Sequence, residues 1–242
     1  VRKGIVRMEA NTDKNNVGNV LAEKIAGSVG NIQLSLEEMK KYKDAAERMM
    51  CYYRCALLET ETKFRVLNEQ FSLQHERNPI NSIQTRIKSA ESIIEKSIRK
   101  NLVLNVNSIE KNINDIAGIR VVCSFIDDVY FLADCLAKQD DIKIIEVKDY
   151  IKSPKANGYR SLHIIIEIPI FLQQEKRMMK VEVQLRTIAM EFWSSLEHKL
   201  RYKKDISPDI ERKISEELFE CAEISTSLDN RMQSVRNVIE EG

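Results

Sequence analysis

A chain of 242 residues with 43% hydrophobic residues is long enough to bury one substantial core. Lysine and arginine number 38 against 37 aspartate and glutamate, which excludes a global positive field that would attract DNA or an anionic membrane. The five cysteines show neither zinc-type pairing nor the density of a secreted scaffold. No apolar run approaches the ~20 residues of a membrane span. We therefore expect a soluble, cytoplasmic protein.

The N-terminal third of the chain divides into an extension and a helical region. Residues 1–31 mix polar and small residues without periodicity, which is typical of a flexible extension. Residues 34–75 contain no Gly or Pro and repeat apolar residues at helical spacing, so one or two long helices are expected within a helical segment over 32–77. Asn78 and Pro79 end this pattern.

The remainder of the chain alternates between strand and helix patterns. Ser89 precedes an apolar-periodic run and is a plausible N-cap for the first of these helices. Interleaved strands and helices predict an α/β (or α+β) sheet domain over 78–204, followed by a C-terminal helical segment over 205–242. Strands are expected at 82–88, 117–125, 142–149, 161–168 and 178–186, and helices at 89–100, 129–138, 189–202 and 210–240.

The strand over 178–186 carries polar residues at every second position. Glu182, Gln184 and Arg186 therefore share one face, about 6.6 Å apart, while the apolar residues between them share the other. Such a strand can be central, with its polar face forming the floor of a cleft. It can equally be an edge strand whose polar face is solvated. Periodicity alone leaves both open.

A second carboxylate precedes the strand over 117–125. If this strand neighbours the strand of Glu182, Asp115 and Glu182 can share a divalent cation, because magnesium prefers oxygen ligands together with nucleotide phosphates. The alternative is that Asp115 only caps a turn.

The predicted domain contains two clusters of basic residues. Arg86, Lys88, Lys96 and Arg99 follow a strand, turn and helix, which suits either a solvated surface or a clamp for a triphosphate. The second cluster surrounds the turn at 157–158, where strand alternation places Tyr159, Ser161 and His163 on one face. A ring beside hydrogen-bonding groups can stack on a base, although these residues can also serve packing alone.

Four segments, taken in order, carry a family resemblance. Arg86-Ile-Lys88-Ser, Asp115-Ile-Ala-Gly-Ile-Arg120, Asn157-Gly-Tyr-Arg-Ser-Leu-His163 and Val181-Glu-Val-Gln-Leu-Arg-Thr187 resemble the synthetase domain of the RelA/SpoT-homologue family. The flanking helices make the chain similar to its single-domain branch, the small alarmone synthetases. This resemblance implies a nucleotidyltransferase-like mixed sheet and the transfer of pyrophosphate from ATP to the 3′-hydroxyl of GDP or GTP.

The resemblance also implies a role for each motif residue. Glu182 and Asp115 would be catalytic and bind Mg²⁺. Arg86 and Arg120 would sandwich the adenine of ATP, and its phosphates would be held by Lys88, Lys96 and Arg99. Tyr159 would stack on guanine, and the other acceptor-binding residues would be Lys148, Lys155, Arg160, His163, Gln184 and Glu191. Glu191 replaces an asparagine found in some members.

Several expectations accompany this assignment. Only three histidines and no His-Asp pair occur, so we expect no hydrolase activity. Family likeness suggests a homotetramer formed through the terminal helices. Two other interpretations remain: a catalytically silent module that binds nucleotides or single-stranded RNA, and a nucleotidyltransferase that adds AMP to an acceptor. Carboxylates in the cleft argue against the silent module, because a pure anion binder gains nothing from them.

Overall fold

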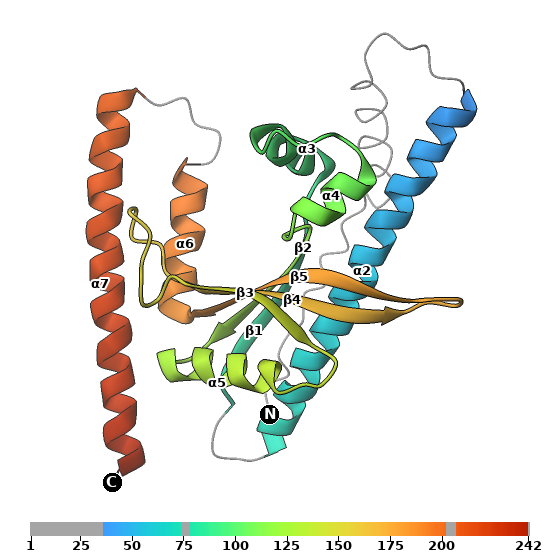
Figure 1. The fold of residues 1–242 in the computed structure, drawn as a ribbon. Helices are drawn as coiled ribbons and strands as arrows, with labels where there is room; N and C mark the ends of the chain where they lie inside the picture. The colour runs from blue at the N-terminus through green and yellow to red at the C-terminus, as the bar shows by residue number, and fades with distance from the viewer. Residues whose placement is uncertain (1–35, 74–77, 202–206, 242) are drawn as a thin grey trace. The chain divides into compact units, whose positions relative to one another are not determined.

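The computed structural model describes residues 36–73, 78–201 and 207–241 (Figure 1). The extension expected over residues 1–31 lies outside the described residues. The helices are α2 (Leu36–Leu73), α3 (Ala90–Arg99), α4 (Val106–Asn112), α5 (Ile126–Ala137), α6 (Ile188–Arg201) and α7 (Pro208–Glu241). The strands are β1 (Ile80–Ile87), β2 (Ala117–Cys123), β3 (Lys143–Asp149), β4 (Leu162–Phe171) and β5 (Lys176–Thr187).

Backbone contacts divide the chain into two compact units. Of the described residues, one unit contains 36–52 with 88–113, and the other contains 53–73, 78–87, 114–201 and 207–241. Helix α2 contributes residues to both units. The first unit otherwise contains α3 and α4, and the second contains the sheet with α5, α6 and α7.

Side-chain caps fix the short helices of the first unit. Ser89 Oγ accepts from Ser92 N at 3.3 Å at the start of α3, as the sequence predicts. Asn101, at φ 53°, ends that helix in the left-handed region that asparagine tolerates. Asn105 Oδ1 caps α4 by accepting from Ser108 N at 2.8 Å. Helix α4 was not among the predicted elements.

The five strands of the second unit form one mixed sheet in the order β1-β2-β5-β4-β3. Strand β5 runs parallel to β2, whereas the other neighbours are antiparallel. The mixed sheet predicted from the sequence is therefore confirmed. Because β5 is the central strand, the alternative of an edge strand with a solvated face is wrong for this segment.

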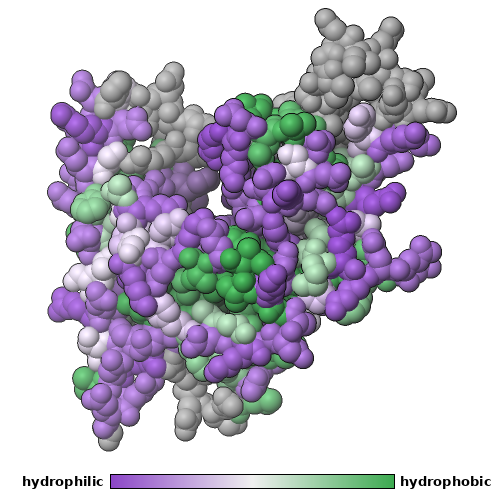
Figure 2. Space-filling model, viewed as in Figure 1, coloured by the Kyte–Doolittle hydropathy of each residue, from purple (hydrophilic) through white to green (hydrophobic). Residues whose placement is uncertain are grey.

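One face of the sheet is apolar and is packed by α5. Val181, Val183 and Leu185 of β5 are fully buried, and α5 contacts both β2 and β5. Val147 and Ile145 on the edge strand β3 stay exposed. Figure 2 shows a patch of apolar residues at the middle of one face of the molecule, in the region where Figure 1 places the sheet. Helix α5 thus covers the centre of the sheet and leaves its β3 edge open.

Helices α6 and α7 pack together at the end of β5. Thr187 Oγ1 accepts from Met190 N at 3.2 Å and so caps α6, while Pro208 stands at the first position of α7, where its missing N–H costs nothing. Trp193 Nε1 donates to Leu218 O at 2.8 Å, which joins the two helices. Across the described residues, no helix has the length and apolar character needed to cross a membrane.

Candidate active site

A row of polar side chains crosses four strands of the second unit. The pairing register places Lys148 opposite His163, His163 opposite Gln184, and Gln184 opposite Arg120. Directly opposed residues on neighbouring strands point to the same face of a sheet. The register therefore brings together four predicted site residues that come from separate parts of the sequence.

The next row of the same face contains Glu182. Its neighbour on β2 is Gly118, and Gly118 is in turn opposite Arg86 on β1. Glycine carries no side chain, so nothing stands on the floor of this face between Glu182 and Arg86. A glycine inside a strand is typical of places where a ligand approaches the backbone closely.

The Glu182 carboxylate is held by two polar neighbours. Gln184 Nε2 donates to its Oε2 at 2.8 Å, and His163 Nδ1 lies 3.3 Å from its Oε1. Burial raises the pKa of Glu182, but the hydrogen bonds and charge supplied by His163, together with Gln184, outweigh burial and lower that pKa overall. Glu182 is therefore an ionised carboxylate, able to accept a proton or bind a cation.

Asp115 lies just before β2, the parallel neighbour of β5. Its negative charge acts to raise the pKa of Glu182, so the two carboxylates are close enough to interact electrostatically. Strands β2 and β5 are neighbours, as a cation shared by Asp115 and Glu182 requires. Two carboxylates at this position suit the oxygen-ligand preference of Mg²⁺.

Tyr159 and His163 form a cluster next to Glu182. The Tyr159 hydroxyl lies 2.8 Å from His163 Nε2 and accepts a hydrogen bond from Arg186 Nη2. Burial raises the pKa of Tyr159, so the phenol stays protonated at neutral pH. His163 thus connects the phenol on one side to the Glu182 carboxylate on the other.

Two lysines lie at the outer side of this cluster. Lys155 Nζ is 4.6 Å from the centroid of the Tyr159 ring and 4.7 Å from that of Tyr150. Lys148 Nζ is 3.0 Å from Glu146 Oε1, and the hydrogen bond to Glu146 raises the lysine pKa. Both lysine side chains are exposed, as contacts to an anionic ligand require.

Glu191 bridges two arginines of the polar face. Arg120 Nη1 donates to its Oε1 and Arg186 Nη1 to its Oε2, each at 2.9 Å. Burial, followed by the charge of Arg186, lowers the pKa of Arg120. Both oxygens of Glu191 thus already accept hydrogen bonds from arginines in this structure.

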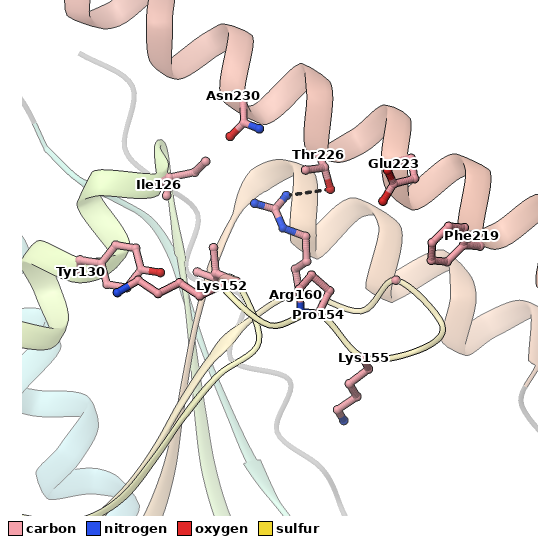
Figure 3. A pocket seen from close by; sticks show the side chains of 12 residues that line it. Ile126, Tyr130, Lys152, Pro154, Lys155, Arg160, Phe219, Glu223, Thr226 and Asn230 are labelled. Atoms are coloured by element: carbon pink, nitrogen blue, oxygen red, sulfur yellow. Dashed lines mark hydrogen bonds between the residues drawn. The ribbon is translucent and has the colours of Figure 1, made fainter.

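Arg160 points away from the cluster of Tyr159 and His163. Its side chain is only 8% exposed, and Nη1 donates to Thr226 Oγ1 at 3.1 Å on α7. Figure 3 shows Arg160 directed toward α7, whereas Lys155 points to the other side of the loop. The family resemblance implies a position for Arg160 around the acceptor nucleotide, and in this structure its guanidinium makes a buried contact with α7.

The remaining predicted cations belong to the first unit. Lys96 and Arg99 stand in the last turn of α3, and Lys88 immediately precedes the Ser89 cap of that helix. Of the three residues predicted to hold the ATP phosphates, Lys88 thus lies at the N-terminal end of α3, and Lys96 and Arg99 lie toward its C-terminal end.

Sequence reasoning missed two residues that organise the site. Alternation predicts Arg186 on the polar face of β5, and in the structure it contacts Tyr159, Gln184 and Glu191 there. The period-two pattern was sufficient to find it. Tyr150, at 6.0 Å from Tyr159 between ring centroids, has no periodic signal because it follows the end of β3.

Comparisons with known proteins identify the family. Residues 85–207 match the family described as "Region found in RelA / SpoT proteins". The GTP pyrophosphokinase YwaC of Bacillus subtilis (strain 168) is 40% identical over 205 residues, which cover 85% of this chain and 97% of YwaC.

Solved structures give the same result. The crystal structure of small alarmone synthetase 1 from Bacillus subtilis bound to its product pppGpp is 32% identical with a TM-score of 0.73, covering 80% of this chain and 97% of that one. A structure of the same synthetase bound to AMPCPP is 28% identical with a TM-score of 0.69, covering 81% and 98%. The chain therefore belongs to the RelA/SpoT family, in the branch of the small alarmone synthetases.

Proposed function

We propose that this chain transfers the β,γ-pyrophosphoryl group of ATP to the 3′-hydroxyl of GDP or GTP, giving AMP and ppGpp or pppGpp. The observation that carries the proposal is the ionised carboxylate of Glu182 on a polar sheet face, in contact with His163, which in turn contacts Tyr159. Relatives named GTP pyrophosphokinase and a related structure holding pppGpp support it.

The acceptor nucleotide is assigned to the cluster around Tyr159. Its ring would stack on guanine, a role that requires the amine of Lys155, now 4.6 Å from the ring centroid, to move toward the phosphates. Lys148 and Lys155 would bind these phosphates as point charges. His163 and Gln184 flank Glu182 and would orient the ribose.

The donor is assigned to the arginines and lysines of the other motifs. Arg86 and Arg120 share the polar face of the sheet, since Arg120 is opposite Gln84 and Arg86 follows two residues later on the same strand. Planar guanidinium groups stack well on aromatic rings, which suits adenine. The triphosphate is assigned, by the family motif, to Lys88, Lys96 and Arg99.

In the proposed reaction, the acceptor's 3′-oxygen attacks the β-phosphorus of ATP and AMP leaves. Glu182 accepts the hydroxyl proton, because its lowered pKa keeps it deprotonated. The cations hold two anionic substrates within reach of each other, a contribution that is mainly entropic. Charge developing on the phosphates is offset by the same cations.

Magnesium is part of the proposal. Asp115 and Glu182 would hold the ion together with phosphate oxygens, which is the ligand set that Mg²⁺ prefers. When bound, the ion would neutralise charge on the transferred group.

Thin-layer chromatography of ATP labelled in the β-phosphate, incubated with GDP and Mg²⁺, tests the function. Label that moves to guanosine tetraphosphate supports the proposal. Label that leaves as pyrophosphate while AMP joins an acceptor would identify a nucleotidyltransferase. Unchanged ATP, with binding of both nucleotides shown by calorimetry, would identify a silent binding module.

Assembly and location complete the proposal. We infer a homo-oligomer, a tetramer by family likeness, because α7 exposes apolar side chains at spacings of three and four: Ile224, Leu228, Met232, Val235 and Ile239. None of the five cysteines, all within the described residues, forms a disulfide, which is consistent with a reducing cytoplasm.

A further inference from the structure

The loop between β3 and β4, residues 150–161, is called the acceptor loop here. Three of its consecutive residues dock on α7, and Gly158 is the first. Its φ of +84° lies in the left-handed region, and an added Cβ would stand 2.5 Å from Ala222 Cβ. The backbone of the loop lies against α7 at this point, so only glycine allows this approach without displacing the loop or the helix.

Tyr159 follows and packs against a small core between α6 and α7. That core consists of Trp193, Leu218 and Ala222. The Tyr159 side chain therefore makes two contacts at once: its hydroxyl lies next to His163, and its ring packs on α6 and α7. Docking of the loop and placement of the phenol are consequently one event.

Arg160 is the third and makes a buried ion pair. Its Nη1 lies 3.4 Å from Asp229 Oδ2, and the two side chains are 8% and 5% exposed. Thr187 Oγ1 donates to the same Oδ2 at 2.8 Å. Thr187 is the last residue of β5, the strand that carries Glu182, so one carboxylate oxygen joins the acceptor loop to the end of the catalytic strand.

Arg160 is held in place by its polar partners and has open space beside it. A cavity of about 560 Å³ lies beside it, between the loop, the start of α5 and α7, and Arg160 and Thr226 line its wall (Figure 3). If Asp229 lost its charge, Arg160 could therefore move into open space instead of being held by packing. Loss of one partner of a buried pair also leaves the other charge uncompensated.

We propose that Asp229 is a positioning residue for the acceptor site: through Arg160 it fixes the loop that carries Lys155 and Tyr159, and through Thr187 it fixes that loop relative to Glu182. This inference rests on the proposed function for its kinetic consequences. It reassigns Arg160 from contact with the acceptor nucleotide to support of the loop.

The test compares Asp229→Asn with Glu220→Gln, an acid-to-amide change at an exposed position of the same helix. Asp229→Asn should raise the KM for GDP at least about tenfold, because small displacements of a binding group are costly, and should leave the KM for ATP within about twofold. Glu220→Gln should change neither. Equal KM effects on both nucleotides, or a fall in kcat with unchanged KM for GDP, would overturn the proposal.

A second measurement is independent of catalysis. Lys152 and Lys155 are exposed loop residues, and release of the loop should speed tryptic cleavage after them in Asp229→Asn relative to Glu220→Gln. If the unmodified chain makes no product, the proposed function fails, while the cleavage rates still decide whether Asp229 anchors the loop. Equal cleavage rates in Asp229→Asn and Glu220→Gln would contradict the anchoring role of Asp229 even if the enzyme is active.

Variants of the partners cover the case in which Asp229→Asn does not fold. Thr187→Ser keeps the hydroxyl donor and should behave like the unmodified chain, whereas Thr187→Val should raise the KM for GDP selectively. In a double-mutant cycle, Arg160→Gln should add little to the defect of Thr187→Val if both act through Asp229. Fully additive defects, or equal behaviour of the serine and valine variants, would contradict the shared role.

Discussion

His163 Nδ1 lies 3.3 Å from Glu182 Oε1, and this contact accounts for the acid–base state of the proposed catalytic carboxylate. Burial acts to raise the pKa of Glu182 and His163 acts to lower it, with His163 and Gln184 prevailing. A carboxyl whose pKa is lowered by folding contributes stability above its unfolded pKa, and that contribution is lost as pH falls through the folded value. The proton acceptor is thus present across the neutral range.

Replacing His163 should move the acidic limb of the pH–rate profile. In His163→Ala the burial effect on Glu182 is no longer offset by His163, so its pKa should rise and kcat should begin to fall at a higher pH. The profile of log kcat against pH, compared with that of the unmodified chain, measures this shift. If the acidic limb stayed at the same pH, it would not report the titration of Glu182.

Glu182→Gln should abolish synthesis while the protein still folds and binds at least one nucleotide. Glutamine is nearly isosteric but cannot accept the proton and is a poor magnesium ligand. The loss of rate should exceed the ~10²–10⁴-fold typical of a missing general base. Asp115→Asn should also be inactive, with partial recovery at high Mg²⁺ that Glu182→Gln lacks. A folded Glu182→Gln protein with a rate within about tenfold of normal would refute this role.

Tyr159→Ala should weaken binding of GDP and leave that of ATP nearly unchanged. A base-stacking contact contributes about 1–3 kcal/mol, or about 5- to 150-fold in KM. Because Tyr159 also packs on the core of α6 and α7, Tyr159→Phe serves as control: it keeps the ring and should keep the KM for GDP. Equal weakening of both nucleotides in the alanine variant would indicate a purely structural tyrosine.

Gly158→Ala should destabilise the protein by about 1–3 kcal/mol, through the strained φ of +84° and the contact with Ala222. Thermal unfolding followed by circular dichroism measures the effect. Made in an Ala222→Gly background, the same change should cost less, because the contact is gone and only the backbone strain remains. A Tm unchanged to within about 1 °C would show that the loop relaxes freely.

Light scattering should give a mass well above the 28.1 kDa of one chain. The reason is the exposed apolar stripe along α7, which an aqueous monomer would leave uncovered. The double variant Val235→Glu with Ile239→Glu places charges in this stripe and should lower the mass. A concentration-independent mass of one chain for the unmodified protein contradicts the proposed assembly.

Residues on regular strands could be placed from the sequence. Alternation assigns Glu182 and Gln184 to one face, and the structure confirms that face. Helix α4 could not be found in this way, because Ile109 is its one buried residue and a single apolar residue has no period.

Loop residues and long-range partners could not be placed from the sequence. Alternation separates Arg160 from the face of Tyr159 and His163, but it does not tell what Arg160 contacts on the other side. Its partner Asp229 lies 69 residues further along the chain, on a helix whose local pattern carries no sign of the ion pair. Such pairings are set by tertiary packing alone.

The alternation along β5 also determines which changes in chain length the protein can accept. Deleting Val183 would turn Gln184 and Arg186 toward α5 and turn Leu185 toward the polar face. A substitution removes one contact, whereas this deletion inverts every residue from position 184 to the end of the strand. The turn over 172–175 between β4 and β5 has no such restriction, because residues gained or lost there leave the pairing of both strands unchanged. Insertions and deletions among functional relatives should therefore occur at this turn and be absent from residues 182–187 of β5.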